Sequence, residues 1–188
     1  MSKFIRLAAG VLILGVLALG VVVFDPVCLS NFPHRWDPDK AVADYSKAIE
    51  LDPKNVAALN ALAWLLATCP EPKVRDPRRA VETAKKAVQL APTEGAYWNT
   101  LGAAHYRAGD GKAAIQALKK AMDLRKGGDC FDWFFLAMAY WRLGEKDQAH
   151  QWYSRAVRWM DKNQPKNEEL RRFRSEAANL FGLEKKSE

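Results

Sequence analysis

The residues best suited to chemistry are few and widely spaced in this chain of 188 residues. No two of its histidines, His34, His105 and His150, stand four positions apart, the spacing that places two metal ligands on one helical face. The pair Gly127 and Gly128 lacks the following Lys-Ser/Thr of a phosphate-binding loop, and no serine lies in a nucleophile-elbow motif. The sequence therefore predicts no catalytic centre and no metal or other cofactor, and the protein is not expected to be an enzyme.

The three cysteines, Cys28, Cys69 and Cys130, are far apart and form no Cys-x-x-Cys pair. We interpret them as unpaired thiols. Cys28 follows an apolar segment, as a lipidated cysteine would, but residues 25–27 lack the small side chains of a lipidation signal. No lipid attachment is predicted.

The elements that must position any functional side chain are short paired helices. Residues 96–108 and 112–124 are predicted to form two helices joined by a glycine-rich turn. In the first helix, Trp98 and Leu101 share a stripe with Gly102, a small residue where another helix can approach closely. One such hairpin cannot bury both of its faces, so it needs neighbours of the same kind.

The hairpin recurs along the chain. Trp98 and Trp133 are 35 residues apart, and so are Ala114 and Ala149. An earlier copy carries five additional residues between its two helices, in the segment 69–77. We therefore predict three whole units preceded by one half unit.

The boundaries of the early helices follow from proline and from capping residues. The half unit is the helix 38–51, and the first whole unit consists of the helices 56–67 and 77–90. The predicted helix caps are Asp37, Asp76, Thr93 and Asp129.

A last amphipathic helix is predicted over residues 167–181. Its apolar stripe consists of Leu170, Phe173, Ala177, Leu180 and Phe181. The side chains expected to lie away from that stripe are Arg171, Arg172, Arg174 and Glu176. Because the last unit of a helical array would otherwise expose its stacking face, we expect this helix to cap it.

The repeated unit, with W-x2-L-G-x2-Y, then A-x3-F, then P, resembles the tetratricopeptide repeat. The residues that carry the likeness are Trp98, Leu101 and Gly102 in the second unit and Trp133, Leu136 and Tyr140 in the third. The resemblance covers residues 38–162 and implies an all-α solenoid of helical hairpins that binds other proteins. The amino-acid sequence of the repeats is also similar to bacterial tetratricopeptide arrays that are often appended to serine/threonine kinase domains. No kinase motif is present in this sequence.

In this family the concave face is lined mainly by the first helix of each unit. Carried over by position, the lining residues are Asn60, Trp64 and Ala67, then Asn99, Ala103, Tyr106 and Arg107, then Phe131, Phe134, Met138, Trp141 and Arg142. The resemblance thus implies a groove for a peptide or a helix of a partner protein. Some members of the family bind acidic carboxyl-terminal tails through lysines and asparagines in this lining. Such binding is not expected here, because Trp64 and Ala103 stand where polar residues would be needed and the first helices carry no lysine.

The chemistry of the lining residues suits a peptide. Asn60 and Asn99 occupy equivalent places and could hydrogen-bond a peptide backbone, and Arg107 and Arg142, also equivalent, could receive carboxylates. Tyr106, Phe134 and Trp141 are the kinds of side chain enriched in binding hot spots. The alternative is that several of these aromatic side chains pack against neighbouring helices.

The amino terminus is predicted to reach a membrane. Residues 7–24 are uncharged and would extend about 27 Å as a helix, close to the thickness of the hydrocarbon core. We expect an anchor over residues 4–24, with Lys3 and Arg6 in the cytoplasm and the repeats on the extracytoplasmic side. A cleaved secretory signal, with a small-x-small site at residues 18–20, is the alternative.

The sequence therefore predicts a single-pass, membrane-anchored interaction module. We divide it into an anchor or signal segment (1–24), a linker (25–37), the solenoid with its capping helix (38–182) and a tail (183–188). The formal net charge of +7 raises the prospect of nucleic acid, but no groove-reading or aromatic-basic module is recognisable, and none is predicted to bind. The alternatives are a structural subunit that self-associates through its convex face or through the exposed end 38–51, or a secreted soluble protein.

Overall fold

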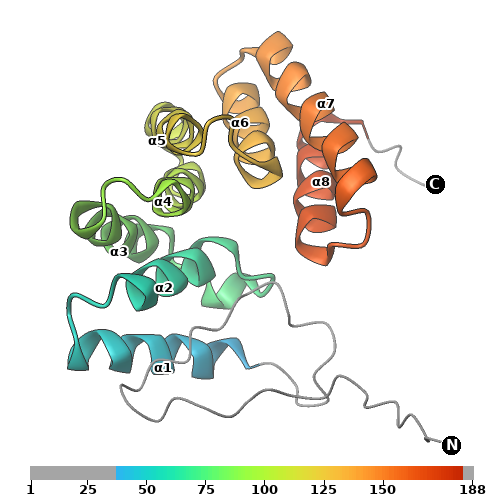
Figure 1. The fold of residues 1–188 in the computed structure, drawn as a ribbon. Coiled ribbons are helices and arrows are strands. Elements are labelled where there is room, and N and C mark those ends of the chain that lie inside the picture. Colours follow the sequence, from blue (N-terminus) through green and yellow to red (C-terminus); the bar gives the residue numbers. More distant parts are fainter. Residues whose placement is uncertain (1–36, 184–188) are drawn as a thin grey trace, which may run out of the picture. The chain divides into compact units, whose positions relative to one another are not determined.

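The computed structural model describes residues 37–183, which fall within one compact unit of the chain. Figure 1 shows that part as a succession of helices, without a strand. They are α1 (Pro38–Leu51), α2 (Val56–Thr68), the short 3-10 helix η2 (Pro72–Val74), α3 (Pro77–Leu90), α4 (Gly95–Arg107), α5 (Gly111–Leu124), α6 (Cys130–Arg142), α7 (Lys146–Asn163) and α8 (Glu168–Phe181). The all-α repeat architecture is confirmed.

The predicted membrane segment, residues 4–24, and the linker up to residue 36 lie outside the described residues. Among the helices of residues 37–183, none has both the length and the apolar character needed to cross a membrane.

The helix starts follow the expected capping chemistry at three of four positions. Asp37 accepts hydrogen bonds from two backbone N–H groups of α1, and Asp76 accepts one from Arg79 at 3.0 Å. Asp129 forms a capping box with Asp132 at the start of α6. The prediction for Thr93 is wrong, because the cap of α4 is the following residue, Glu94, whose side chain makes no capping bond.

The helices pair as antiparallel hairpins, α2 with α3, α4 with α5 and α6 with α7, and α1 packs on α2. The small residue at position 102 is needed for this packing. A Cβ atom added to Gly102 would lie 2.5 Å from Cγ of Leu118 on α5, far inside normal contact.

The inserted segment between α2 and α3 is tied back to the first repeat. Its 3-10 helix places Val74 in a small apolar cluster with Leu65 and Cys69, against Tyr45 of α1. The N–H of Asp76 donates to the carbonyl of Leu66 at 3.0 Å. The insertion therefore extends the core of the repeat.

The outer face of α1 is polar. Its exposed side chains include Asp39, Lys40, Asp44, Lys47 and Glu50. This face offers mainly charged groups, although Leu51 at the end of α1 is 77% exposed.

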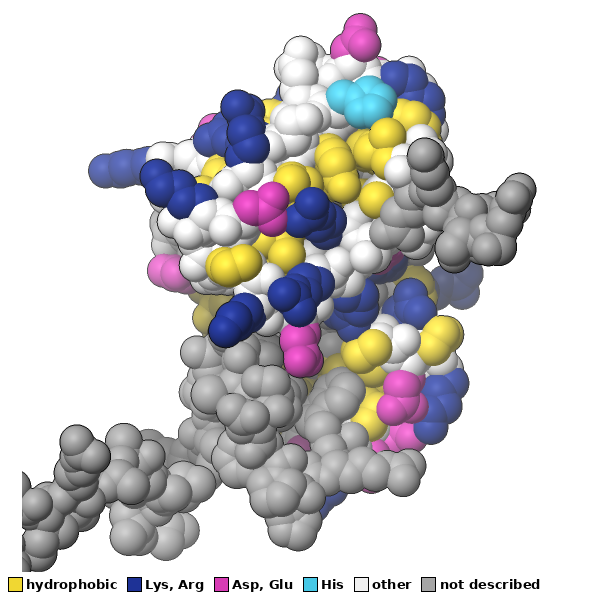
Figure 2. Space-filling model, turned by 90° about the vertical axis from the view of Figure 1, so that its right-hand side faces the viewer, with side chains coloured by type: hydrophobic (Ala, Val, Ile, Leu, Met, Phe, Trp, Pro, Cys, Tyr) yellow, Lys and Arg dark blue, Asp and Glu magenta, His cyan; other side chains and the backbone are white. Residues whose placement is uncertain are grey.

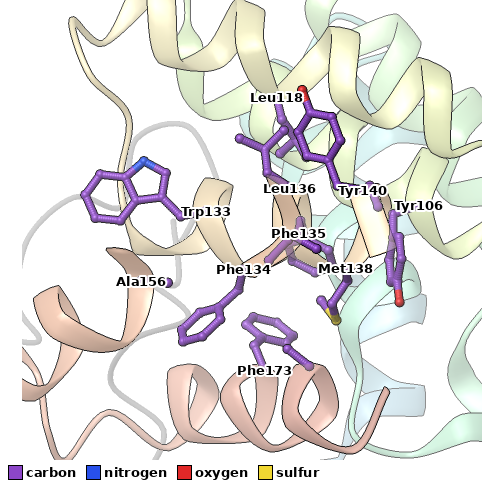
Figure 3. Close-up of a cluster of buried hydrophobic side chains, with 14 of the residues drawn as sticks. Tyr106, Leu118, Trp133, Phe134, Phe135, Leu136, Met138, Tyr140, Ala156 and Phe173 are labelled. Carbon is purple, nitrogen blue, oxygen red and sulfur yellow. The ribbon is translucent and has the colours of Figure 1, made fainter. Parts of the chain in front are cut away.

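The largest apolar core surrounds α6. Figure 3 shows Phe134, Phe135 and Met138 of this helix together with Phe173 of α8, and each of these side chains is fully buried. A helix that is apolar on all sides needs cover on all sides. Here α5 and α7 cover two sides of α6, and α8 covers a third.

Candidate functional site

The inner face of the repeats, formed by α2, α4 and α6, holds the last helix of the chain. In Figure 1, α8 lies inside the curve made by the preceding helices and beside α6. The ring of Phe173 meets Trp64 of α2 at 6.2 Å, and Phe131 and Phe135 of α6 at 6.2 and 4.9 Å between centroids. Helix α8 thus reaches from the third repeat to the first.

This placement goes beyond the cap that we expected from the sequence. Helix α8 does contact α7, through an ion pair between Arg174 and Asp161 and through Phe181 against Tyr153. It packs more extensively on α6, however, and Phe173 of its apolar stripe reaches Trp64 and Phe131 on the inner face, where the predicted groove lies.

An ion pair joins α8 to the middle repeat. Arg107 of α4 pairs with both carboxylate oxygens of Glu176, with Nη2 2.7 Å from Oε2. The Nε of Arg107 also donates to the carbonyl of Ala67, at the end of α2, at 3.1 Å. One guanidinium therefore links α2, α4 and α8. The prediction that Glu176 lies away from the apolar contact is wrong.

A second polar contact joins α8 to the first repeat. The indole N–H of Trp64 donates to Oε1 of Glu169 at 3.1 Å. Burial raises the pKa of Glu169, against the effects of Arg172 and of the Trp64 hydrogen bond, both of which lower it. Glu169 and Glu176 are seven residues apart and flank Phe173 on one face of α8, so their spacing was a usable signal for this contact.

The far end of α8 packs on Trp141. The rings of Trp141 and Phe181 are stacked, with centroids 4.3 Å apart and planes at 18°. Nearby, Arg142 lies over the ring of Tyr106 at 4.2 Å and donates to the carbonyl of that residue at 3.3 Å. Arg142 thus repeats the carbonyl contact of Arg107 one unit later, but pairs with no carboxylate of residues 37–183.

The structure separates the predicted lining residues into three groups. Those fully or almost fully buried are Ala67, Asn99, Ala103, Tyr106, Phe134 and Met138. Those half-buried are Asn60, Trp64, Arg107, Phe131 and Trp141, and Arg142 is exposed. Burial raises the pKa of Tyr106 to about 12, so its hydroxyl stays protonated beside the two arginines. Of the half-buried group, Trp64, Arg107, Phe131 and Trp141 contact α8.

The two equivalent asparagines differ in their surroundings. Asn99 donates to the carboxylate of Asp132 at 2.7 Å, and Arg125 pairs with the same carboxylate. Burial, and then the charge of Asp129, raise the pKa of Asp132 to about 6. The buried Oδ1 of Asn60 has no hydrogen-bond partner in the described part of the chain. Sequence reasoning missed the burial of Asp132, since an acidic residue near a helix start is normally exposed.

The structure is a curved array of helical hairpins, and its inner face holds a helix. Repeat proteins of this class use such a concave surface to bind other proteins. Three segments, residues 45–82, 73–129 and 133–162, match family descriptions of the tetratricopeptide repeat. The chain belongs to the tetratricopeptide repeat family and is a protein interaction module.

Solved structures support the same fold. A structure titled as the MamA protein is 27% identical, with a TM-score of 0.55, over 78% of this chain and 80% of that chain. A second MamA structure is 24% identical at a TM-score of 0.55, over 78% and 90% of the two chains. A thermophilic protein of Thermus thermophilus, TTC0263, is 18% identical at a TM-score of 0.56, over 76% and 73%. No curated protein matches the chain at a significant level.

Proposed function

We propose that this protein is a membrane-anchored interaction module whose inner face binds an amphipathic helix of a partner protein at the place that α8 occupies. The observation that carries the proposal is the way α8 itself is held there, by Arg107, Trp64 and the ring cluster around Phe173. The inner face thus already accommodates a helix.

The contacts of α8 indicate which side chains a partner helix would carry. Glu169 stands four residues before Phe173, and Glu176 stands three residues after it. A partner helix would carry an aromatic side chain flanked by two carboxylates at this spacing, one for the indole N–H of Trp64 and one for Arg107.

Such a partner must replace a tethered helix. Only residues 164–167 join α7 to α8, so α8 is present at an effective concentration on the order of millimolar. A partner with the same contacts therefore competes only if it binds more tightly or is itself concentrated near the module. Two proteins confined to one membrane meet the second condition, and this links the inner face to the proposed anchor.

The helix site is tested with the full-length chain and a labelled peptide of residues 165–183. In the double variant Glu169→Gln with Glu176→Gln, the weakened α8 should leave and the peptide should bind, whereas the wild type should bind at least about tenfold less. Adding Arg107→Gln to the double variant should remove the gain. Circular dichroism confirms that each variant stays helical. A double variant that keeps its helicity, releases α8 and still binds no peptide would exclude the inner face.

The membrane anchor is tested separately, with a carboxyl-terminal tag on the full chain. Residues 7–24 are the apolar segment that supports the anchor. We expect full-length protein in the membrane fraction and digestion of its repeats by protease added from outside the inner membrane. A shortened soluble product would instead identify residues 1–20 as a cleaved signal.

A further inference from the structure

A second surface lies where the start of α6 meets the end of α7. It is an open hollow of about 530 Å³, lined by Trp133, Arg155, Arg158, Trp159, Lys162 and Asn163, which we call the Arg155 hollow. None of these residues makes the hydrogen bonds or ion pairs that hold α8. Figure 2 views the side of the molecule that carries α7 and α8, where Lys and Arg side chains are interspersed with hydrophobic ones.

Arg155 is held in place by aromatic rings. Its Cζ lies 4.2 Å from the ring centroid of Trp133 and 5.4 Å from that of Trp152. The ring of Trp133 in turn meets Trp159 edge to face at 6.3 Å. A guanidinium stacked on an indole keeps its N–H donors at its edges, where they can receive a planar carboxylate.

The cations of the hollow have no acidic partner. Within residues 37–183, the nearby carboxylates of Asp129 and Asp161 pair with arginines outside it, and no salt bridge reaches Arg155, Arg158 or Lys162. Arg158 uses its Nε on the carbonyl of Ser154 at 3.3 Å, which leaves its two terminal amino groups available. Three positive charges around one hollow attract an anionic group.

Trp133, which lines the hollow, carries a donor without an acceptor in the described part of the chain. Trp133 is 5% exposed, and its buried Nε1 has no hydrogen-bond partner among residues 37–183. The equivalent Trp98 donates to the carbonyl of Pro92 at 2.8 Å. The indole of Trp133 therefore lacks the hydrogen bond that Trp98 makes, and its ring contacts Arg155 and Trp159 at the hollow.

We propose that the Arg155 hollow binds an acidic segment of a partner protein, independently of the inner face. Carboxylates of the segment pair with Arg155 and Arg158, and an apolar side chain rests on the half-buried ring of Trp159. A membrane surface fits less well, because the exposed large apolar side chains of residues 37–183 all lie elsewhere. They are Leu51, Leu90, Leu143 and Leu183.

The test measures binding of a fluorescent peptide of glutamate and phenylalanine residues to the full-length chain at physiological salt. We expect Arg155→Gln with Arg158→Gln to weaken binding at least about tenfold. The matched control is Lys85→Gln with Lys86→Gln, which removes the same charge from exposed positions on α3 and should change binding less than about twofold. The indole N–H signal of Trp133 should shift when the peptide is added.

Several outcomes would overturn the proposal. Absence of binding to the wild type would exclude the site. An equal loss in both double variants would leave only general charge attraction. Displacement of the peptide by an equal concentration of inorganic phosphate would assign the hollow to a small anion. Binding of vesicles that contain anionic lipid, without binding of the peptide, would assign it to the membrane.

Discussion

Arg107 on α4 and Glu176 on α8 form a two-point ion pair across 69 residues of sequence. Their side chains are only 11% and 30% exposed, and the same guanidinium lies over the ring of Phe135 at 5.5 Å. This pair joins the middle of the array to the end of the chain, so it is the first place to test whether α8 contributes to stability.

Replacing Glu176 with glutamine should lower the free energy of unfolding by about 1–3 kcal/mol, because it leaves a partly buried guanidinium without its counter-charge. Urea unfolding followed by circular dichroism measures the loss. The exposed pair Arg174 and Asp161 is the control on the same helix, and Arg174→Gln should cost less than about 1 kcal/mol. Equal losses would mean that the Arg107 pair is no stronger than a surface contact.

The buried carboxyl group of Asp132 should make the free energy of unfolding depend on pH in an unusual direction. Its pKa is raised to about 6 by burial and by Asp129, so between about pH 4 and 6 the folded chain binds the proton that the unfolded chain releases. The contribution of Asp132 to the free energy of unfolding therefore rises as the pH falls below 6 and reaches its full value below about pH 4. The total change is about 3 kcal/mol.

The measurement compares urea unfolding of the wild type and of Asp132→Asn across that pH range. The wild type should gain stability relative to the variant as the pH is lowered from 7 to 4. A constant difference, or a relative loss on acidification, would show that the carboxylate keeps an ordinary pKa in the folded protein.

Gly102→Ala should destabilise the protein by about 1–3 kcal/mol, because the new methyl group would overlap Leu118 in a packed core. Thermal and urea unfolding both report the change. Gly111→Ala provides the comparison, since its Cβ would meet Leu143 at 3.3 Å, where a flexible side chain at the surface can move. We expect that variant to stay within about 1 kcal/mol of the wild type.

The two described cysteines should be unreactive in the folded state. Cys69 and Cys130 are free thiols, 3% and 0% exposed, and burial raises the pKa of both, that of Cys130 to about 12. In a Cys28→Ser variant, a thiol reagent at pH 8 should label no cysteine of the native protein and both in urea. Rapid labelling without denaturant would mean that the repeats open locally.

Much of the fold follows from short-range sequence features. The predicted helices 38–51 and 77–90 match α1 and α3, because an Asp-Pro pair marks each start in the chain itself. The 35-residue spacing of Trp98 and Trp133 identifies two hairpins by local packing alone. Such signals need no knowledge of distant contacts, which is why they succeed.

The contents of the inner face could not be predicted in the same way. An amphipathic pattern shows that α8 must bury one stripe, but either the end of α7 or the inner face could accept it. The choice depends on how Phe173 fits among Trp64, Phe131 and Phe135, which come from two different repeats. The Thr93 prediction failed for a local reason, because the turn before α4 places Glu94 at the cap position.

The contact between Trp64 and Glu169 spans 105 residues and should make the unfolding of the repeats cooperative. An array held only by neighbouring units loses its terminal repeats one at a time, and its hydrogen-exchange protection declines toward the ends. Here the first and third repeats share α8, so neither of these two repeats can open without releasing α8. The described repeats should therefore exchange and unfold as one cooperative unit.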